Sequence, residues 1–197
     1  MVSGIVLAAG EARRMGQQKL LLDFNGRPIL WWVLEAVLAS DLEEIICVVR
    51  EQNEMRRKIR LDQNRVRWVT NDKAHEGQST SLAAGLRAVS VQSAAALFLV
   101  GDQPLIKTEL INGLIDLHSK SAAPIVAPVF RGETRNPVLF HRDLFPELLQ
   151  VTGDRGGKIL MEKYREKVAL LKWEDESPFL DLDDWQDYQR LIKPTGQ

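Results

Sequence analysis

The segment Ile5-Val6-Leu7-Ala8-Ala9 leads directly into Gly10-Glu11-Ala12-Arg13-Arg14-Met15-Gly16-Gln17-Gln18-Lys19 near the N-terminus. The first part is a short apolar run, which is typical of a strand that is buried on both faces of a parallel sheet. The second part is a polar loop that contains two glycines and three cations. The segment therefore predicts a central strand whose carboxyl end opens into a functional loop.

Apolar runs and helical segments alternate after this loop. The further predicted strands are Ile45–Val49, Val66–Thr70, Ala95–Val100 and Ile125–Val129. The predicted helices between them are Ile29–Ser40, Glu51–Gln63, Ser79–Val91 and Lys107–Lys120. In the first helix, Pro28 suits the first turn, and apolar residues follow the 3.6-residue period. This order predicts a doubly wound, mainly parallel α/β sheet with right-handed crossovers.

The pattern becomes irregular after Val129. The expected elements are a polar excursion Phe130–Arg135, a short strand Pro137–Phe140, helices Asp143–Gln150 and Gly157–Glu166, a strand Val168–Lys172 and a helix Asp183–Ile192. Pro137 places its strand at a sheet edge or marks the start of the strand. No linker or repeat interrupts the chain, so we expect a single domain over 1–192, with 193–197 as a frayed tail.

Composition excludes several classes of protein. The formal net charge of −1 gives no support for a nucleic-acid or anionic-membrane partner. No apolar run approaches the roughly 20 residues of a membrane helix, and no basic stretch precedes the first apolar run as in a signal peptide. The single cysteine, Cys47, lies in an apolar run and is expected to be a buried packing residue. We therefore expect a cytoplasmic protein.

The opening loop has the chemistry of a phosphate site. In open α/β sheets, ligands bind at the carboxyl ends of the strands, where glycines let backbone amides approach an anion. Arg14 and Lys19 would neutralise charge that develops in a transition state. The loop matches neither the P-loop nor the G-x-G-x-x-G fingerprint. A tight loop with solvated charges is the alternative that residue types alone leave open.

The stretch Leu7–Lys19 resembles the signature L-A-A-G-x-x-x-R-M-G-x-x-K of nucleotidyltransferases with the Rossmann-like sugar-nucleotide-transferase fold. It is most similar to the molybdenum cofactor cytidylyltransferase family, a relative of the molybdenum cofactor guanylyltransferases. Further matching segments follow in order, namely Gly77–Leu82, Gly101–Leu105, Asn136–Phe140, Gly153–Gly157 and Leu180–Asp183. The resemblance divides the chain into a nucleotide-binding half, about 1–105, and an acceptor and metal half, about 106–192.

This resemblance implies a Mg²⁺-dependent enzyme, with Mn²⁺ as an alternative metal. It would join CMP from CTP to the terminal phosphate of molybdopterin or of its molybdenum-loaded form and release pyrophosphate. A transient contact with a molybdenum hydroxylase or its insertion chaperone is also implied. The attacking phosphate oxygen is already ionised at neutral pH, so no general base is required.

Two acidic positions are the candidate metal ligands. Asp102 follows an apolar strand, and a hard carboxylate there suits Mg²⁺. Residues two apart in a strand face the same side, so Asp181 and Asp183 could both face the metal. The resemblance assigns the second ligand to the earlier position, Asp181, with Asp183 in reserve. Capping of a following helix explains Asp183 equally well, and a turn former is the alternative for Asp102.

The candidate nucleotide-binding residues come from the opening loop, from the segment Gly77–Leu82 and from Asp102. They are Leu7, Ala8, Ala9, Gly10, Arg14, Lys19, Gly77, Ser79, Ser81 and Asp102, of which Arg14, Lys19 and Asp102 are also the candidate catalytic residues. Ser79 or Ser81 is also a candidate helix cap. The choice of CTP rests on Ala9, since related proteins with Leu-Ala-Gly-Gly at this position tend to take guanosine nucleotides.

The acceptor side carries the weaker part of the resemblance. The candidate residues are Arg135, Asn136, Pro137, Gly153, Asp154 and Lys158. Asn-Pro and Gly-Asp are also ordinary turn dipeptides. Here Arg135 stands where many relatives have glycine, Lys158 where they often have arginine, and Ala12 where they often have a phosphate-binding serine.

Three alternatives remain open. One is the use of GTP, or transfer to another phosphorylated acceptor, because one fold hosts many functions. Another is a non-catalytic carrier or insertion factor for the molybdenum cofactor, although such a protein would need neither the metal carboxylates nor Lys19. A dinucleotide-binding oxidoreductase domain is disfavoured by the missing fingerprint.

Overall fold

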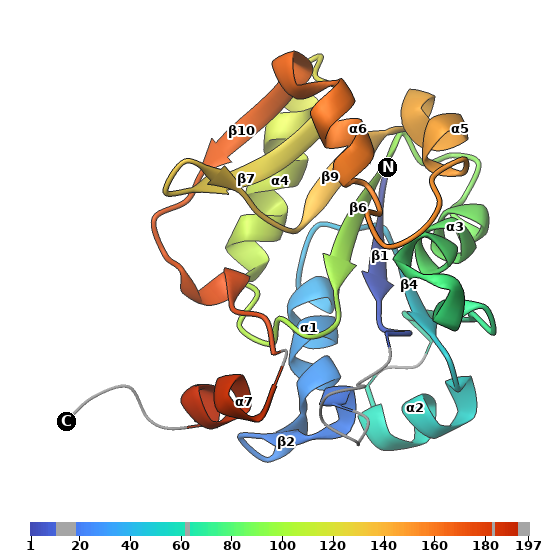
Figure 1. The fold of residues 1–197 in the computed structure, drawn as a ribbon, viewed down its shortest axis with the longest axis vertical. Coiled ribbons are helices and arrows are strands. Elements are labelled where there is room, and N and C mark those ends of the chain that lie inside the picture. The colour runs from blue at the N-terminus through green and yellow to red at the C-terminus, as the bar shows by residue number, and fades with distance from the viewer. Residues whose placement is uncertain (11–18, 62–63, 183, 193–197) are drawn as a thin grey trace.

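The computed structural model describes residues 1–10, 19–61, 64–182 and 184–192. An eight-stranded sheet forms the centre, and seven strands follow the order β10-β7-β9-β6-β1-β4-β5, with β8 paired to β7 (Figure 1). These strands are β1 (Val2–Leu7), β4 (Glu44–Val49), β5 (Arg67–Thr70), β6 (Ala95–Val100), β7 (Ile125–Phe130), β8 (Glu133–Thr134), β9 (Val138–His141) and β10 (Val168–Lys172). The predicted α/β fold with a mainly parallel sheet is confirmed.

The sheet is parallel at β5, β4, β1 and β6, and again where β10 pairs with β7. Between these two parallel parts lies β9, which runs antiparallel to both β6 and β7. The strand predicted from Pro137 therefore lies inside the sheet, and Pro137 directly precedes it. Of the two predicted positions for Pro137, a sheet edge or the start of its strand, the second is the one observed. A proline just before the strand removes none of the hydrogen bonds of the sheet.

Helices cover both faces of the sheet. They are α1 (Ile29–Leu38), α2 (Gln52–Ile59), α3 (Gln78–Ala88), α4 (Thr108–Lys120), α5 (Phe145–Leu148), α6 (Lys158–Lys163) and α7 (Trp185–Ile192). The buried side chains of α1, α2 and α4 join one core cluster, and those of α3, α5 and α6 join the other. Cys47 is fully buried, as predicted, and its burial raises the pKa of the thiol.

Several predicted boundaries were wrong. Helix α2 ends at Ile59 instead of Gln63, since Arg60 adopts a left-handed conformation with a φ of 49°. Pro28 is the N-cap of α1 and lies outside the first turn. It also belongs to an unpredicted hairpin, formed by β2 (Asp23–Phe24) and β3 (Arg27–Pro28).

The carboxyl ends of β1 and β6 point toward the same end of the molecule, where the β2–β3 hairpin and α7 also lie (Figure 1). The fold therefore brings the end of β1 and the loop after β6 together, and the site is built there.

Within the described residues, no helix is long and apolar enough to cross a membrane.

Candidate active site

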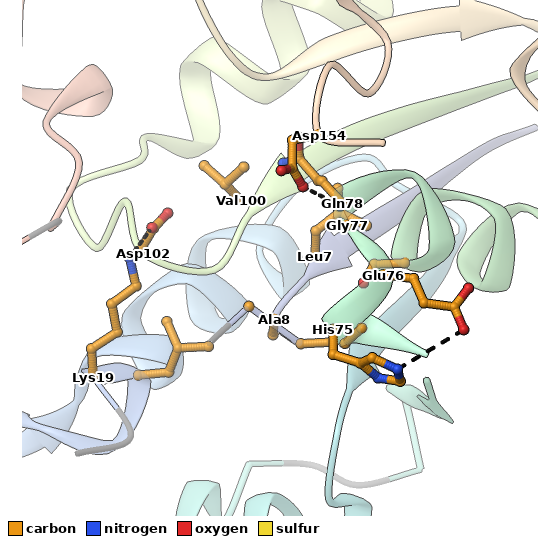
Figure 2. Close-up of a pocket in the computed structure, with 15 residues that line it drawn as sticks. Leu7, Ala8, Lys19, His75, Glu76, Gly77, Gln78, Val100, Asp102 and Asp154 are labelled. Carbon is orange, nitrogen blue, oxygen red and sulfur yellow. Dashed lines mark hydrogen bonds and ion pairs between the residues drawn. The ribbon is translucent and has the colours of Figure 1, made fainter. Parts of the chain in front are cut away.

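A cleft of about 400 Å³ opens at the carboxyl ends of β1 and β6, which is within the range of small-molecule sites. Figure 2 shows Lys19 and Asp102 at one end of the cleft and His75 and Glu76 at the other. Its lining residues are Leu7, Ala8, Ala9, Gly10, Lys19, Leu20, Ala74, His75, Glu76, Gly77, Gln78, Ser81, Val100, Asp102 and Asp154. Most of the predicted nucleotide-binding residues therefore share one cavity.

Gly101 allows the loops after β1 and β6 to come close together. Its backbone N–H donates to the carbonyl of Leu7 at 2.9 Å. A Cβ at this position would lie 3.2 Å from both Ala8 Cβ and Leu7 O. A larger residue would therefore push the Asp102 loop away from the β1 loop.

Lys19 joins three segments at one end of the cleft. It begins the 3₁₀ helix η1 (Lys19–Leu21), and its Nζ donates to Asp102 Oδ2 at 2.6 Å and to the carbonyl of Leu182 at 2.8 Å. The two charged side chains are only 16% and 20% exposed. An ammonium and a carboxylate interact more strongly in such a partly desolvated site than in open water.

The Asp181 carboxylate lies beside the loop that carries Asp102. The side chain of Gln103 donates through Nε2 to Asp181 Oδ1 at 2.8 Å, and the N–H of Leu182 donates to the carbonyl of Asp102 at 3.2 Å. The predicted metal ligands Asp102 and Asp181 are thus carried by two segments that are hydrogen-bonded to each other. The predicted residues Arg14 and Asp183 lie outside the described residues.

This donor set fits a hard divalent cation. Mg²⁺ is commonly held by one or two carboxylates together with substrate phosphates and water, and the two segments supply two carboxylates. Among the described residues, no cluster of three or more acidic, histidine or cysteine side chains could hold a metal ion. A metal at this end would therefore take its remaining ligands from a bound phosphate chain and from water.

Helix α3 begins at the wall of the cleft. Its N-cap is Gly77, with a φ of 116°, and no side chain caps it from that position. The capping role considered for Ser79 and Ser81 was wrong, since Gly77 is the N-cap and both serines lie inside α3. The Ser79 backbone N–H donates to Gly153 O at 3.1 Å, and the Ser81 hydroxyl accepts from Asn71 Nδ2 at 2.9 Å. Ser81 lines the cleft, whereas Ser79 is not among its lining residues.

A distant carboxylate serves this helix start instead. Asp154 Oδ1 accepts the backbone N–H of Gln78 at 3.2 Å, and an acidic group at a helix N-terminus is electrostatically favourable. Asp154 also lines the cleft (Figure 2). The segment predicted to hold the acceptor thus contacts the segment predicted to hold the nucleotide.

The far end of the cleft carries residues that sequence reasoning missed. His75 and Glu76 belong to the 3₁₀ helix η2 (Ala74–Glu76), and His75 Nε2 lies 4.0 Å from Glu76 Oε1. The only sequence signal was their position directly before the motif that starts at Gly77. Gln78 and Gln103 were also missed, because each stands inside a motif whose other members were assigned the chemistry.

A smaller cavity of about 80 Å³ adjoins the cleft and shares Leu7, Gln78 and Val100 with it. Its walls are mainly apolar and include Phe98 and Phe140. Of the predicted acceptor residues, Asn136 and Lys158 line this cavity. Arg135 and Pro137 line neither cavity, and Arg135 instead pairs with Glu133 at 2.6 Å.

Residues 4–168 match the family model described as "MobA-like NTP transferase domain". The protein PucB of Bacillus subtilis, named a purine catabolism protein, is 30% identical, and the match covers 95% of this chain and 94% of that protein. Nicotine blue oxidoreductase of Paenarthrobacter nicotinovorans is 26% identical over 97% of this chain and 96% of that protein. A probable molybdenum cofactor guanylyltransferase of Natranaerobius thermophilus is 28% identical over 66% of this chain and 62% of that protein.

A solved structure has the same fold over nearly the whole chain. The protein Rv0371c of Mycobacterium tuberculosis H37Rv superposes with a TM-score of 0.86 at 27% identity, covering 97% of both chains. Its complex with manganese gives a TM-score of 0.81 at 26% identity, covering 98% of this chain and 99% of that chain.

Proposed function

The chain belongs to the MobA-like NTP transferase family and is a nucleotidyltransferase, and from that premise we propose that it transfers CMP from CTP to the terminal phosphate of molybdopterin or molybdenum-loaded molybdopterin. The observation that carries this proposal is the grouping of Lys19, Asp102 and residues 181–182 at one end of a nucleotide-sized cleft. A relative named as a molybdenum cofactor guanylyltransferase supports the class of acceptor.

The charge distribution supports one orientation of the nucleotide. The triphosphate would lie at the Lys19 and Asp102 end, where a cation and the metal carboxylates meet. The base would then lie toward His75 and Glu76, and the backbone of Ala8–Gly10 would pass along the phosphates. The acceptor would approach from the adjoining smaller cavity, where Lys158 supplies a cation.

The reaction is a displacement at the α-phosphorus of CTP. An oxygen of the acceptor phosphate forms the new bond to phosphorus, and the bond to the bridging oxygen breaks as pyrophosphate leaves with its electron pair. A bound Mg²⁺ or Mn²⁺, held by Asp102 and Asp181, would supply Lewis-acid stabilisation of the phosphate oxygens. The Lys19 ammonium would exchange its contact with Asp102 for the developing negative charge at the pentavalent centre, a contribution of about 10²–10³ in rate.

The choice of CTP over GTP rests on Ala9, which lines the cleft. The guanylyltransferase relative supports GTP as the competing nucleotide. Binding of CTP and GTP to the purified protein, compared by calorimetry with Mg²⁺, separates the two. Tighter binding of CTP is expected, and a clear preference for GTP would overturn this part of the proposal.

A second candidate function is that of a dinucleotide-binding oxidoreductase, which the relative named nicotine blue oxidoreductase supports. The chain lacks the G-x-G-x-x-G fingerprint of dinucleotide-binding domains. We therefore rank the oxidoreductase function below nucleotidyl transfer. Nicotinamide dinucleotide should accordingly bind no better than adenosine monophosphate.

The deciding experiment measures pyrophosphate release from CTP and GTP with Mg²⁺, with and without the molybdenum-loaded pterin. Release from CTP that depends on the pterin is expected, and Asp102→Ala should abolish it by removing a metal ligand. Binding of the pterin without any release would favour a carrier. Near-normal release by Asp102→Ala would show that this carboxylate does not serve the metal.

A further inference from the structure

Gln103 is a buried residue of the loop that carries Asp102, and its side chain contacts the segment that carries Asp181. It is only 4% exposed, and its Nε2 donates to Asp181 Oδ1 at 2.8 Å. We infer that Gln103 is a positioning residue, which orients the Asp181 carboxylate toward the metal end of the cleft. This inference rests on the proposed function, because it concerns the same metal site.

The position of Gln103 makes this hydrogen bond hard to replace. A buried amide donor that loses its partner costs about 1–3 kcal/mol, whereas Asp181 is exposed and has water available. The buried donor therefore favours the one carboxylate rotamer that satisfies it.

Two further bonds hold the backbone of the segment that carries Asp181, one to the Asp102 loop and one to Lys19. The Leu182 N–H donates to the carbonyl of Asp102 at 3.2 Å, and Lys19 Nζ donates to the carbonyl of Leu182 at 2.8 Å. These two bonds fix the position of the segment, whereas Gln103 acts on a carboxylate oxygen. The backbone of this segment and the carboxylate of Asp181 are thus held by different bonds. Removal of the Gln103 amide should therefore change the orientation of the carboxylate more than the position of the backbone.

The chemistry of an amide suits this task. A neutral donor binds one carboxylate oxygen without cancelling the negative charge that attracts a cation. A lysine or arginine at position 103 would neutralise Asp181 and compete with the metal, and a glutamate would repel the carboxylate. Hydrogen-bond partners of metal ligands commonly act in this way, and their loss typically lowers metal affinity about 10- to 100-fold.

A purely structural role is the competing explanation, in which Gln103 only holds the C-terminal segment against the sheet. The two roles differ in what they change. A structural tie affects the unfolding temperature, whereas a positioning residue changes metal affinity at temperatures where the protein is fully folded.

The experiment titrates Mn²⁺ into the full chain without nucleotide and measures free Mn²⁺ by electron paramagnetic resonance. Gln103→Met keeps the length of the side chain and removes the donor, so we expect about 10- to 100-fold weaker Mn²⁺ binding. A higher Mg²⁺ concentration should restore most of the pyrophosphate release that Gln103→Met loses. Gln103→Ser, whose hydroxyl is too short to reach Asp181, is the second variant should the methionine prevent folding.

Ser93→Ala is the matched control. Ser93 is a fully buried polar residue that is hydrogen-bonded to Ser3, and it precedes β6, at the opposite end of that strand from Asp102. This variant should lower the unfolding temperature and leave Mn²⁺ affinity unchanged. In an Asp181→Asn background, Gln103→Met should cause no further loss of affinity, because its effect runs through Asp181.

The outcomes separate the inference from the function on which it rests. Wild-type protein that neither binds Mn²⁺ nor releases pyrophosphate would overturn both. Wild-type protein that does both, together with a folded Gln103→Met variant of unchanged Mn²⁺ affinity, would overturn the role of Gln103 alone. A loss of affinity that persists undiminished in the Asp181→Asn background would also overturn it.

Discussion

Gly77 is the position at which one methyl group should disturb both the fold and the cleft. Its φ of 116° lies in the region that favours glycine, and it stands at the start of α3 against residues 153–154. In Gly77→Ala, the new Cβ would lie 2.8 Å from Asp154 Oδ1 and 3.0 Å from the carbonyl carbon of Gly153. The substitution therefore combines backbone strain with a close contact.

The cost follows from these two components. A non-glycine residue in a sparsely populated conformation costs about 1–3 kcal/mol. Relief of the contact moves residues 153–154 away from α3, which weakens the Ser79 N–H to Gly153 O bond and the Gln78 N–H to Asp154 bond. At about 1 kcal/mol for each bond, the free energy of unfolding should fall by about 3–5 kcal/mol.

Urea unfolding of Gly77→Ala and Gly26→Ala isolates the contact. Gly26 also has a positive φ, 80°, but no described atom lies within 4 Å of the place that an alanine Cβ would take there, so this control should lose only about 1–2 kcal/mol. Gly77→Ala should also bind CTP more weakly, since Asp154 lines the cleft. Equal losses of stability in the two variants would refute the close-approach argument.

Two further substitutions test the site and the stability separately. No described atom lies within 4 Å of a Cβ at Gly10, so Gly10→Ala should change the free energy of unfolding by less than about 0.5 kcal/mol. It should nevertheless weaken CTP binding in calorimetry, and unchanged binding would argue against phosphate contacts there. Burial, followed by the neighbouring His141, lowers the pKa of His118 from 6.5. The unfolded chain therefore takes up this proton first as the pH falls through 6.5, so the wild type should lose stability over that range. His118→Gln should lose less stability than the wild type over the same pH range, as judged by urea unfolding midpoints on either side of pH 6.5. An identical pH dependence of the two proteins would contradict this.

Local pattern predicted most of the sheet because most of its parallel strands are built around an apolar run. The strand Val168–Lys172 was predicted with its observed bounds. The sequence also placed Asp102 beside the opening loop, since both follow the carboxyl ends of predicted strands, and these strands pair side by side in the structure. The ion pair between Lys19 and Asp102 was not predicted, because it depends on which strands are neighbours in the sheet.

Long-range pairing was beyond the reach of local pattern. The insertion of β9 between β6 and β7 depends on which strand edges are available after folding. The start of α3 offered two serines as local caps, yet Asp154, 76 positions away from Gln78 along the chain, supplies the hydrogen bond. Gln103 shows the same limit, because its importance depends on contact with Asp181, 78 positions away.

Burial also changes how Ala9 could select the nucleotide. Ala9 is only 1% exposed and packs into the core cluster beneath α3, so its methyl group presents almost no surface to a base. An effect on CTP against GTP would then act through the position of the backbone around Ala9. The base itself is expected near His75 and Glu76. The Glu76 carboxylate can accept a hydrogen bond from the exocyclic amine of cytosine and equally from that of guanine. Selection between the two bases should therefore depend on the distance between η2 and the β1 loop more than on either residue alone.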